Sequence, residues 1–440
     1  MSAVRTFPSG VHPHDEKSWT AGKAVQTILP KAGSEMVFPM SQHIGAPCEP
    51  LVAVGDKVLL GQKIGDSEKF VTSPVHSSVS GAVTAIRKAE TPSGTSCQAV
   101  VIENDGQDQG VKPKDDKLQS LPDKAEILRR IREAGVVGLG GAGFPTHIKL
   151  SPPPEKKIDT LIVNAAECEP YLTTDHRVML EMPDRMISGF KIILSLFPGA
   201  KGYIAIEINK PEAIEKITKL VEKESNIEVV SLKTKYPQGA EKQLIYACTH
   251  REVPSGGLPA DIGCLVDNVD TVVAIQRAVL KERPLIRRII TVSGGAAANP
   301  GNYKVRIGMK YSDMMEAIGG FKSDPYKLIS GGPMMGVALF TLDIPVIKTS
   351  SSLLCFTEEE GKLPEERNCI RCGKCVDHCP MRLMPLDLNQ YVIHNEMDSF
   401  VANHGLDCIE CGTCSYVCPA KRYLAQSIRT ARKEMLARRK

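Results

Sequence analysis

The sequence predicts a multidomain chain that joins β modules, an α/β domain and a small helical domain. Three observations support this prediction. Short apolar runs between glycine turns fill residues 41–105, strands and helices alternate over residues 159–274, and eight cysteines fall in two copies of one spacing between Cys369 and Cys418. The chain has 440 residues, a length that corresponds to about two to four domains.

The composition argues against several classes of protein. Hydrophobic residues make up 42% of the chain, so it can bury cores and is not a disordered polymer. Aromatic residues make up 5%, with one tryptophan, so we expect no protein that reads nucleic-acid bases by stacking. The start, Met1-Ser2-Ala3, has no apolar signal region, and no window of about 18 residues lacks charge and proline. We therefore expect neither export nor a membrane-spanning helix.

The net charge of +4 is unevenly distributed. Residues 421–440 hold eight Lys or Arg and one Glu, a charge of +7, which leaves −3 for the rest of the chain. A basic segment of this kind can lie on anionic lipid or dock on a protein subunit, and the alternative is a solvated terminal helix. We treat residues 426–440 as a basic C-terminal tail.

The N-terminal part divides into three predicted segments. Residues 1–40 contain several prolines and glycines and are predicted to be an irregular extension. Residues 41–105 alternate apolar and small polar residues around glycine turns, a pattern that resembles the barrel-sandwich fold of biotinyl and lipoyl domains. Those domains carry a modifiable lysine at a hairpin tip, and since no clear equivalent is present we expect a packing module. Residues 106–123 are polar and are predicted to be a linker.

Residues 120–285 are predicted to form an α/β domain. Ile127, Leu128 and Ile131 share one face of a helix that ends at Gly135. Beyond it, apolar strands alternate with helices, which indicates βαβ units and a largely parallel sheet. The strands are expected at 160–165, 203–208 and 227–232, and the helices at 211–224 and 270–280.

Two smaller modules follow. Residues 286–350 are predicted to be a β-grasp module, with a hairpin around residues 299–301 and a short helix capped by Ser312. Residues 360–425 are predicted to be short helices and loops built around the cysteines, and the basic tail continues from them.

Both cysteine runs have the pattern C-x2-C-x2-C-x3-C-P. Three thiolates two residues apart can wrap one face of an iron–sulfur cubane, and the fourth, beside a proline, points to a second site. This is the spacing of bacterial ferredoxins, in which the fourth cysteine of each run binds the other cluster. Zinc sites and disulfides are the alternatives, but a zinc ribbon needs no fourth cysteine before a proline. The spacing predicts an α-helical ferredoxin-like domain with two [4Fe–4S] clusters, one held by Cys369, Cys372, Cys375 and Cys418 and the other by Cys408, Cys411, Cys414 and Cys379.

A glycine-rich run follows the first predicted helix of the α/β domain. Gly138, Gly140 and Gly143 match G-x-G-x-x-G, but a helix precedes them where a dinucleotide-binding turn has a strand, and Pro145 follows at once. The run is therefore not the standard dinucleotide fingerprint. Its backbone amides can still approach a phosphate or a flat ring, and the alternative is a tight interdomain turn.

Four motifs resemble, in chain order, the flavin-binding 51-kDa subunit of respiratory complex I. They are GGAGFPTHIK, VNAAECEP, GAEKQLI and VDNVDT. The resemblance implies a Rossmann-like α/β domain in which FMN lies on the glycine loop and NADH stacks on the FMN. The residues that it carries over as cofactor contacts are Gly138, Gly140, Gly141, Gly143, Phe144, Lys149, Asn164, Glu167, Glu169, Glu241, Asn268 and Thr271.

The resemblance also implies roles for three of these residues. Lys149 would offer a positive charge to the flavin or to its phosphate. Phe144 would border the nucleotide site, or else pack under the loop. Glu169 would accept a hydrogen bond from a ribose hydroxyl of NADH, or else be a solvated loop acid.

Three positions depart from the family motifs. Ala240 stands in place of one of two acids, Asp267 in place of an asparagine, and His147 in place of a glycine. An acid beside a flavin would lower its reduction potential, unless Asp267 points away. The six cysteines outside the two runs, among them Cys168 in the flavin motif, have no ligand spacing and are expected to be ordinary thiols.

The order of modules as a whole resembles the RnfC family, whose members belong to the Rnf complex, a membrane ferredoxin:NAD+ oxidoreductase coupled to ion translocation. This implies hydride exchange between NAD(H) and FMN, single-electron exchange with the clusters, and no catalytic side chain. It implies the other subunits of the complex as partners, ferredoxin acting through them, and a peripheral position on the cytoplasmic face of the cell membrane. The alternatives are a cobalamin reductase of a bacterial microcompartment, an NADH-oxidising hydrogenase subunit and a non-catalytic electron-carrying scaffold.

Overall fold

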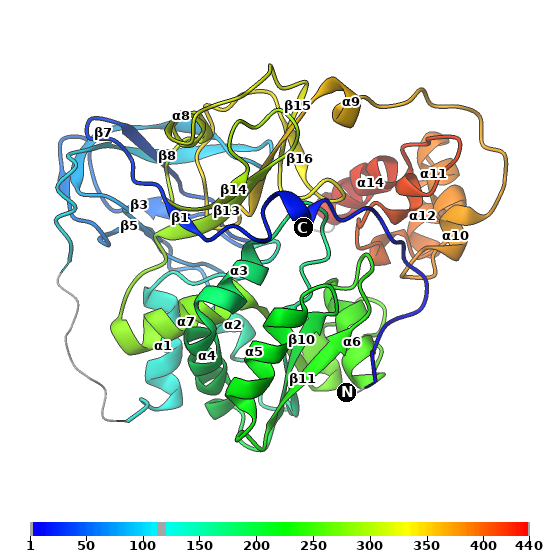
Figure 1. Ribbon diagram of the computed structural model, residues 1–440, viewed down its shortest axis with the longest axis horizontal. Coiled ribbons are helices and arrows are strands. Elements are labelled where there is room, and N and C mark those ends of the chain that lie inside the picture. The colour runs from blue at the N-terminus through cyan, green and yellow to red at the C-terminus, as the bar shows by residue number, and fades with distance from the viewer. Residues whose placement is uncertain (1–2, 112–119, 439–440) are drawn as a thin grey trace.

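Four β-sheets organise the part of the chain that the computed structural model describes, residues 3–111 and 120–438 (Figure 1). The predicted N-terminal extension, linker and basic tail reach beyond this part, because residues 1–2, 112–119 and 439–440 lie outside the described residues. Within the described ranges, no helix has the length and hydropathy of a membrane span.

Two antiparallel sheets form the N-terminal module. One has the order β2 (Glu35–Pro39), β8 (Ser96–Asn104), β7 (Gly81–Glu90) and β4 (Lys57–Val58), and the other has the order β3 (Glu49–Pro50), β5 (Lys63–Asp66) and β6 (Val75–His76). Strand β2 precedes residue 41, so this sheet begins within the segment that the sequence predicts to be irregular. The strand forms because it pairs with β8 and buries Met36 and Phe38 completely, and the local sequence does not reveal so distant a partner.

A parallel sheet lies at the centre of the α/β domain, as the alternation of strands and helices predicts. Its order is β11 (Ile227–Leu232), β10 (Lys201–Glu207), β9 (Thr160–Ala165) and β12 (Cys264–Asn268). The helices are α1 (Lys124–Glu133), α2 (Thr146–Lys149), α3 (Thr174–Glu181), α4 (Pro183–Ser195), α5 (Pro211–Val221), α6 (Glu241–Thr249) and α7 (Val269–Lys281). Asn164 and Asn268 are register neighbours at the carboxyl ends of β9 and β12. Parallel strands place their carboxyl ends at one edge, where open α/β sheets bind ligands.

A six-stranded sheet follows in the chain, with α8 (Tyr311–Ala317) beside it. Its order is β1 (Gln26–Thr27), β14 (Gly301–Arg306), β13 (Arg287–Ser293), β17 (Ser352–Phe356), β15 (Lys327–Ser330) and β16 (Val337–Leu339). The predicted hairpin is confirmed, since β13 and β14 pair antiparallel. The prediction of Ser312 as the helix cap is wrong, because α8 starts one residue earlier and follows Lys310. The inner strand β17 lies beyond residue 350, and the edge strand β1 comes from the N-terminal segment.

The C-terminal part consists of short helices around the cysteines. They are α9 (Glu358–Gly361), α10 (Lys374–Asp377), α11 (Pro385–Ile393), α12 (Met397–Ala402), α13 (Thr413–Tyr416) and α14 (Leu424–Arg438). Helices α10 and α13 each follow a glycine in the left-handed conformation, Gly373 with φ 78° and Gly412 with φ 79°. Helix α14 packs on α11 and buries Leu424, Ile428 and Ala431. The first part of the basic tail is therefore a packed helix and not a frayed one.

The N-terminal segment joins these parts. In Figure 1 it runs, in blue, from beside α6 past the helical C-terminal part to β1. Arg5 bridges to Leu232 of β11, and Gly10 donates a backbone hydrogen bond to the carbonyl of His378 in the first cysteine run. The turn of 3-10 helix Lys17–Trp19 follows, before the segment reaches the six-stranded sheet.

Candidate functional site

The glycine run forms a closed loop that two buried side chains hold. Val137 and Pro145 bridge across its base, and the Gly138 amide donates to the Phe144 carbonyl at 2.9 Å. The Thr271 hydroxyl accepts from the Leu139 amide at 2.9 Å, and Arg288 of β13 donates to the Leu139 carbonyl at 3.0 Å. Thr271 and Arg288 are almost fully buried. The predicted contact Thr271 thus fixes the loop, and Arg288 is a residue that no sequence signal indicates.

One face of this loop is open. A Cβ atom at Gly141 would meet nothing within 4 Å, whereas one at Gly140 would lie 2.8 Å from the Asn268 side chain. Phe144 keeps 37% of its surface exposed, so it does not simply pack under the loop. A cradle lined by backbone, with an exposed aromatic ring at its end, fits the flat ring of FMN.

The two strand-end asparagines bring the other motifs to the loop. The Asn164 amide donates to the Gly239 carbonyl at 2.7 Å, which ties the GAEKQLI segment to β9. Asn268 caps α7, since its side chain accepts from the Asp270 amide at 2.9 Å. Its own amide group donates to Asp175 at 2.7 Å. Burial, followed by repulsion from neighbouring acids, raises the pKa of Asp175 to about 8. Asp175 is a further polar group that the sequence reasoning missed, although its place at the start of a helix was a signal.

Lys149 connects two more of the predicted segments. Its ammonium lies 3.1 Å from Glu241 and 3.9 Å from Asp267, and it also donates to the Val266 carbonyl. Burial opposes the charge, but Glu241 and Asp267 raise the pKa of Lys149 above its usual value. Asp267 therefore faces Lys149, which accounts for the acid at this departure from the family motif.

The two glutamates of the VNAAECEP motif have protein partners. The Glu167 carboxylate accepts from the Asp175 amide at 2.6 Å and from the His176 amide at 3.2 Å, so it caps α3. The Glu169 carboxylate accepts from the Met334 amide at 3.1 Å and lies 3.5 Å from the Tyr236 hydroxyl. A ribose hydroxyl of NADH would have to share these oxygens. Burial raises the pKa of Glu169 to about 7.

The first predicted ligand set lines one cavity. Its walls include Cys369, Cys372 and Cys375 of the first run and Cys418 of the second. Cys369 and Cys372 are exposed. The structure therefore brings the fourth cysteine of the second run to the first three of the other, as the crossed pattern predicts.

The second predicted set gathers on the other side of the same module. Burial raises the pKa of Cys414, and the neighbouring thiols Cys408, Cys411 and Cys379 raise it further. Four thiolates this close repel one another unless a cationic centre lies between them, so the donor set fits an iron–sulfur cluster. All fourteen cysteines are in the described residues, and none forms a disulfide. A search of the same residues found no group of His, Cys, Asp and Glu arranged to hold a single metal ion.

The second set is also the one in contact with the α/β domain. The Tyr236 hydroxyl donates to the Cys411 carbonyl at 2.7 Å. Gln243 of α6 donates to the Pro380 carbonyl, next to Cys379, at 3.1 Å. Tyr236 is 1% exposed, and it links Glu169 of the flavin motif to the cysteine module.

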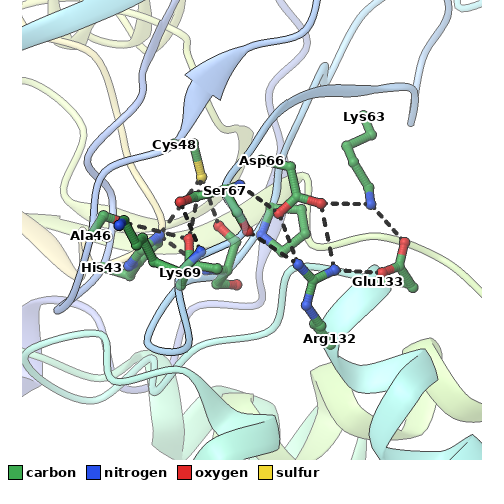
Figure 2. Close-up of polar contacts among 12 residues, drawn as sticks. His43, Ala46, Cys48, Lys63, Asp66, Ser67, Lys69, Arg132 and Glu133 are labelled. Atoms are coloured by element: carbon green, nitrogen blue, oxygen red, sulfur yellow. Dashed lines mark hydrogen bonds and ion pairs between the residues drawn. The ribbon is translucent and has the colours of Figure 1, made fainter.

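The barrel-sandwich module is fastened to the helix that precedes the glycine loop. Figure 2 shows Lys63 and Arg132 lying between Asp66 and Glu133, with N–O distances from 2.6 to 3.2 Å. Arg132 and Glu133 belong to the last turn of α1 and to its end. A loop of the module also touches the glycine loop, because the Ile44 amide donates to the Gly143 carbonyl at 3.2 Å.

His147 lies in α2, beside this contact. Burial, followed by repulsion from Arg132 and His43, lowers its pKa to about 4. The ring is therefore neutral at physiological pH. Its Nδ1 atom has no hydrogen-bond partner within the described part of the chain, and nothing in the structure explains why histidine replaces glycine here.

A relative in Acetobacterium woodii matches almost the whole chain. It is 48% identical over 438 residues, which is 99% of this chain and 98% of the relative, and it is named as one subunit, an RnfC protein, of the Na(+)-translocating ferredoxin:NAD(+) oxidoreductase complex. The chain belongs to the RnfC family. A second RnfC relative, from the proton-translocating ferredoxin:NAD(+) oxidoreductase complex of Clostridium ljungdahlii, is 49% identical over 87% of this chain and 83% of its own length.

Family models cover the RnfC chain module by module. They are the RnfC barrel sandwich hybrid domain at residues 5–107, the Nuo51 FMN-binding domain at 131–277, the SLBB domain at 289–338 and the 4Fe-4S dicluster domain at 368–423. The cofactors are therefore FMN with NAD(H) and two [4Fe–4S] clusters. Neither a cobalamin reductase nor a non-catalytic scaffold is favoured by these matches.

One solved structure is similar over part of the chain. It is the NAD+-reducing [NiFe]-hydrogenase in the H2-reduced state, with 19% identity, a TM-score of 0.49, and coverage of 71% of this chain and 60% of that chain.

Proposed function

We propose that the chain is the NAD(H)-reacting subunit of an ion-translocating ferredoxin:NAD+ oxidoreductase. In this role it passes electrons between NAD(H), FMN and two [4Fe–4S] clusters. The observation that carries the proposal is a continuous set of contacts, from the open glycine loop through Asn268, Asp175 and Glu167 to Glu169, Tyr236 and the cysteines. When bound, the flavin supplies the conversion between hydride and single-electron chemistry that no side chain of the protein can perform.

The side chains around the loop bind and orient the cofactors in this proposal. The backbone of the glycine loop holds the flavin ring, and Phe144 borders the nicotinamide nucleotide. Lys149 offers a positive charge that Glu241 and Asp267 partly neutralise. The full set proposed to line the flavin and nucleotide sites is Gly138, Gly140, Gly141, Gly143, Phe144, Lys149, Asn164, Glu167, Glu169, Glu241, Asn268 and Thr271.

The two clusters have different places in the proposed electron path. The cluster of Cys379, Cys408, Cys411 and Cys414 exchanges electrons with the flavin side, which the contact of Tyr236 with the Cys411 carbonyl supports. The cluster of Cys369, Cys372, Cys375 and Cys418 exchanges electrons with a partner subunit. The exposure of Cys369 and Cys372 supports this order.

The partners follow from the names of the relatives. Because both relatives are named as subunits of an ion-translocating complex, we propose that other subunits hold this chain at the cytoplasmic face of the membrane. Ferredoxin then reacts with the chain through those subunits, and NAD(H) reacts with it directly.

The experiment that tests the proposal is anaerobic purification followed by cofactor analysis. We expect about one noncovalent FMN and about eight iron atoms per chain. Addition of NADH should bleach the flavin absorbance and reduce an artificial electron acceptor. A protein that contains the iron but neither binds FMN nor oxidises NADH would contradict the proposal and would favour an electron-carrying scaffold.

A further inference from the structure

A lysine from the N-terminal segment is buried against the loop between the two redox sites. The Lys17 ammonium donates to the carbonyls of Glu167 and Glu169, both at 2.9 Å, and to that of Leu172. The residue is 7% exposed. Three carbonyls match the three N–H donors of an ammonium group, so its hydrogen bonds are complete within the protein.

The geometry around Lys17 is held by several contacts. Its turn follows Glu16, which is in the left-handed conformation with φ 47°. The Asp15 carbonyl accepts from the Tyr171 amide at 2.7 Å, and the hydroxyls of Thr20 and Thr173 lie 2.7 Å apart. The N-terminal segment thus follows the loop from both sides of Lys17. A buried ammonium is costly unless it is fully paired, and burial lowers the pKa of Lys17.

The loop that Lys17 holds faces the flavin site at one end. Glu167 caps α3 through the Asp175 amide, and Asp175 accepts from the Asn268 amide group at 2.7 Å. Asn268 in turn packs so close to Gly140 that a Cβ there would lie 2.8 Å away. A shift of the Glu167 backbone would therefore be felt at the glycine loop.

The same loop faces a cluster site at its other end. Glu169 accepts from the Met334 amide and lies beside the Tyr236 hydroxyl, which holds the Cys411 carbonyl. Met334 also lies against the cysteine module, since a Cβ at Gly412 would lie 2.8 Å from the Met334 carbonyl. Lys17 binds the backbone of both glutamates, and so it links the two ends.

A second buried lysine makes the contribution of Lys17 distinct. Lys210 donates to the Ala166 carbonyl at 2.6 Å, at the start of the same loop. Lys210 belongs to the segment matched by the FMN-binding model, whereas Lys17 lies in the segment matched by the barrel-sandwich model. The N-terminal segment therefore supplies a part of the redox site that the flavin domain does not itself contain.

We propose that Lys17 is a positioning residue that sets the geometry for electron transfer between the flavin and the cluster bound by Cys379, Cys408, Cys411 and Cys414. This inference rests on the proposed function. In the step concerned, NADH is the reductant, and one electron at a time leaves the reduced flavin for the oxidised cluster. Without the ammonium, three carbonyls lose their donor and the loop relaxes. The distance between the redox centres is then no longer fixed, while the nicotinamide side of the flavin is unchanged.

The test is stopped-flow reduction of the FMN- and iron-loaded protein by NADH under anaerobic conditions. Flavin and cluster absorbance are followed separately in wild type and in Lys17→Met. We expect cluster reduction to slow by about tenfold or more, because electron transfer depends steeply on placement, while flavin reduction stays within about twofold. Lys23→Met is the matched control, because Lys23 lies in the same segment and is exposed, with its ammonium on the Pro300 carbonyl. It should behave as wild type.

Two results would overturn the inference. One is a Lys17→Met protein in which flavin and cluster reduction both keep their wild-type rates, and the other is an equal slowing of both. If Lys17→Met loses FMN, Lys17→Arg decides, because it keeps the charge and the donors but displaces them. Slowed cluster reduction at full FMN content supports the inference, and wild-type rates overturn it. A wild-type protein whose clusters NADH never reduces would instead count against the proposed function.

Discussion

Gly140 and Gly141 are neighbours in the glycine loop, but a side chain would meet different surroundings at each. At Gly140 a Cβ collides with Asn268, so a substitution there disturbs the protein itself. At Gly141 there is open space, and any group that a side chain meets there has to be a bound one. Gly141 is therefore the cleaner position at which to test the flavin site.

We predict that Gly141→Leu loses FMN and keeps its iron. The leucine has room within the protein but would occupy the face on which the flavin lies. FMN released on denaturation and iron per chain measure the two outcomes. Gly22→Leu is the matched control, because Gly22 is exposed and also has open space around it. Full FMN content in Gly141→Leu would contradict the assignment of this loop.

Glu169 makes the stability of the protein depend on pH. Burial raises its pKa from the usual 4.5 to about 7. Between these values the folded state keeps a proton that the unfolded state has released, so the free energy of unfolding falls as the pH rises. Above about pH 7 both states are ionised, and the cost of the buried charge is fully present.

We predict that Glu169→Gln removes this cost. The melting temperature of the variant minus that of wild type should increase from pH 5 to pH 7 and then stay constant up to pH 8.5. Thermal unfolding of both proteins across this range measures the difference. Glu49→Gln, at an exposed strand residue, should show no such trend. A difference that is independent of pH would rule out a raised pKa for Glu169.

At the residue scale, the sequence indicates which side chains gather but not what they contact. Motif matching brings Thr271, Asn268 and Lys149 to one place, and the structure agrees with that. Their partners are side chains from distant segments, such as Arg288 on the Leu139 carbonyl and Asp267 on Lys149. Such partners follow from the packing of whole domains, which no local pattern encodes.

At the scale of elements, the cysteine runs exchange their fourth ligands. We predict that Cys418→Ser and Cys372→Ser remove the same cluster, because both residues line one cavity. Iron should fall from about eight to about four atoms per chain in each variant, with the same electron paramagnetic resonance signal lost. Cys411→Ser should remove the other signal. If Cys418→Ser and Cys411→Ser removed the same signal, the crossed assignment would be wrong.

The elements that the sequence predicts best are those with their own periodic pattern. The parallel strands β9, β10 and β11 and the helices α1 and α7 lie within a few residues of their predicted positions. The strands β1, β2 and β17 were missed or lay outside the expected boundaries, because each is short and depends on a distant partner. The domain boundaries therefore stay predictions, since the sheets recruit strands from across them.

At the scale of the whole molecule, the N-terminal segment links the barrel-sandwich, α/β and cysteine modules. The C-terminal helix uses part of its positive charge internally, because Arg429 and Arg432 pair with Glu410 at 3.1 and 2.8 Å. The charge that remains for lipid or for another subunit is smaller than the composition suggests. Docking through the tail stays a prediction, which truncation after α11 cannot test because α14 packs on that helix.

The central claim is that NAD(H), the flavin and both clusters form one electron path within this chain. The most direct test is an anaerobic titration with NADH in which electron paramagnetic resonance follows the reduced clusters. The account predicts that wild type shows reduced clusters and that Gly141→Leu, with the same iron content but no FMN, shows none. Clusters that stay oxidised in wild type while its flavin is reduced, or that are reduced equally in Gly141→Leu, would contradict it.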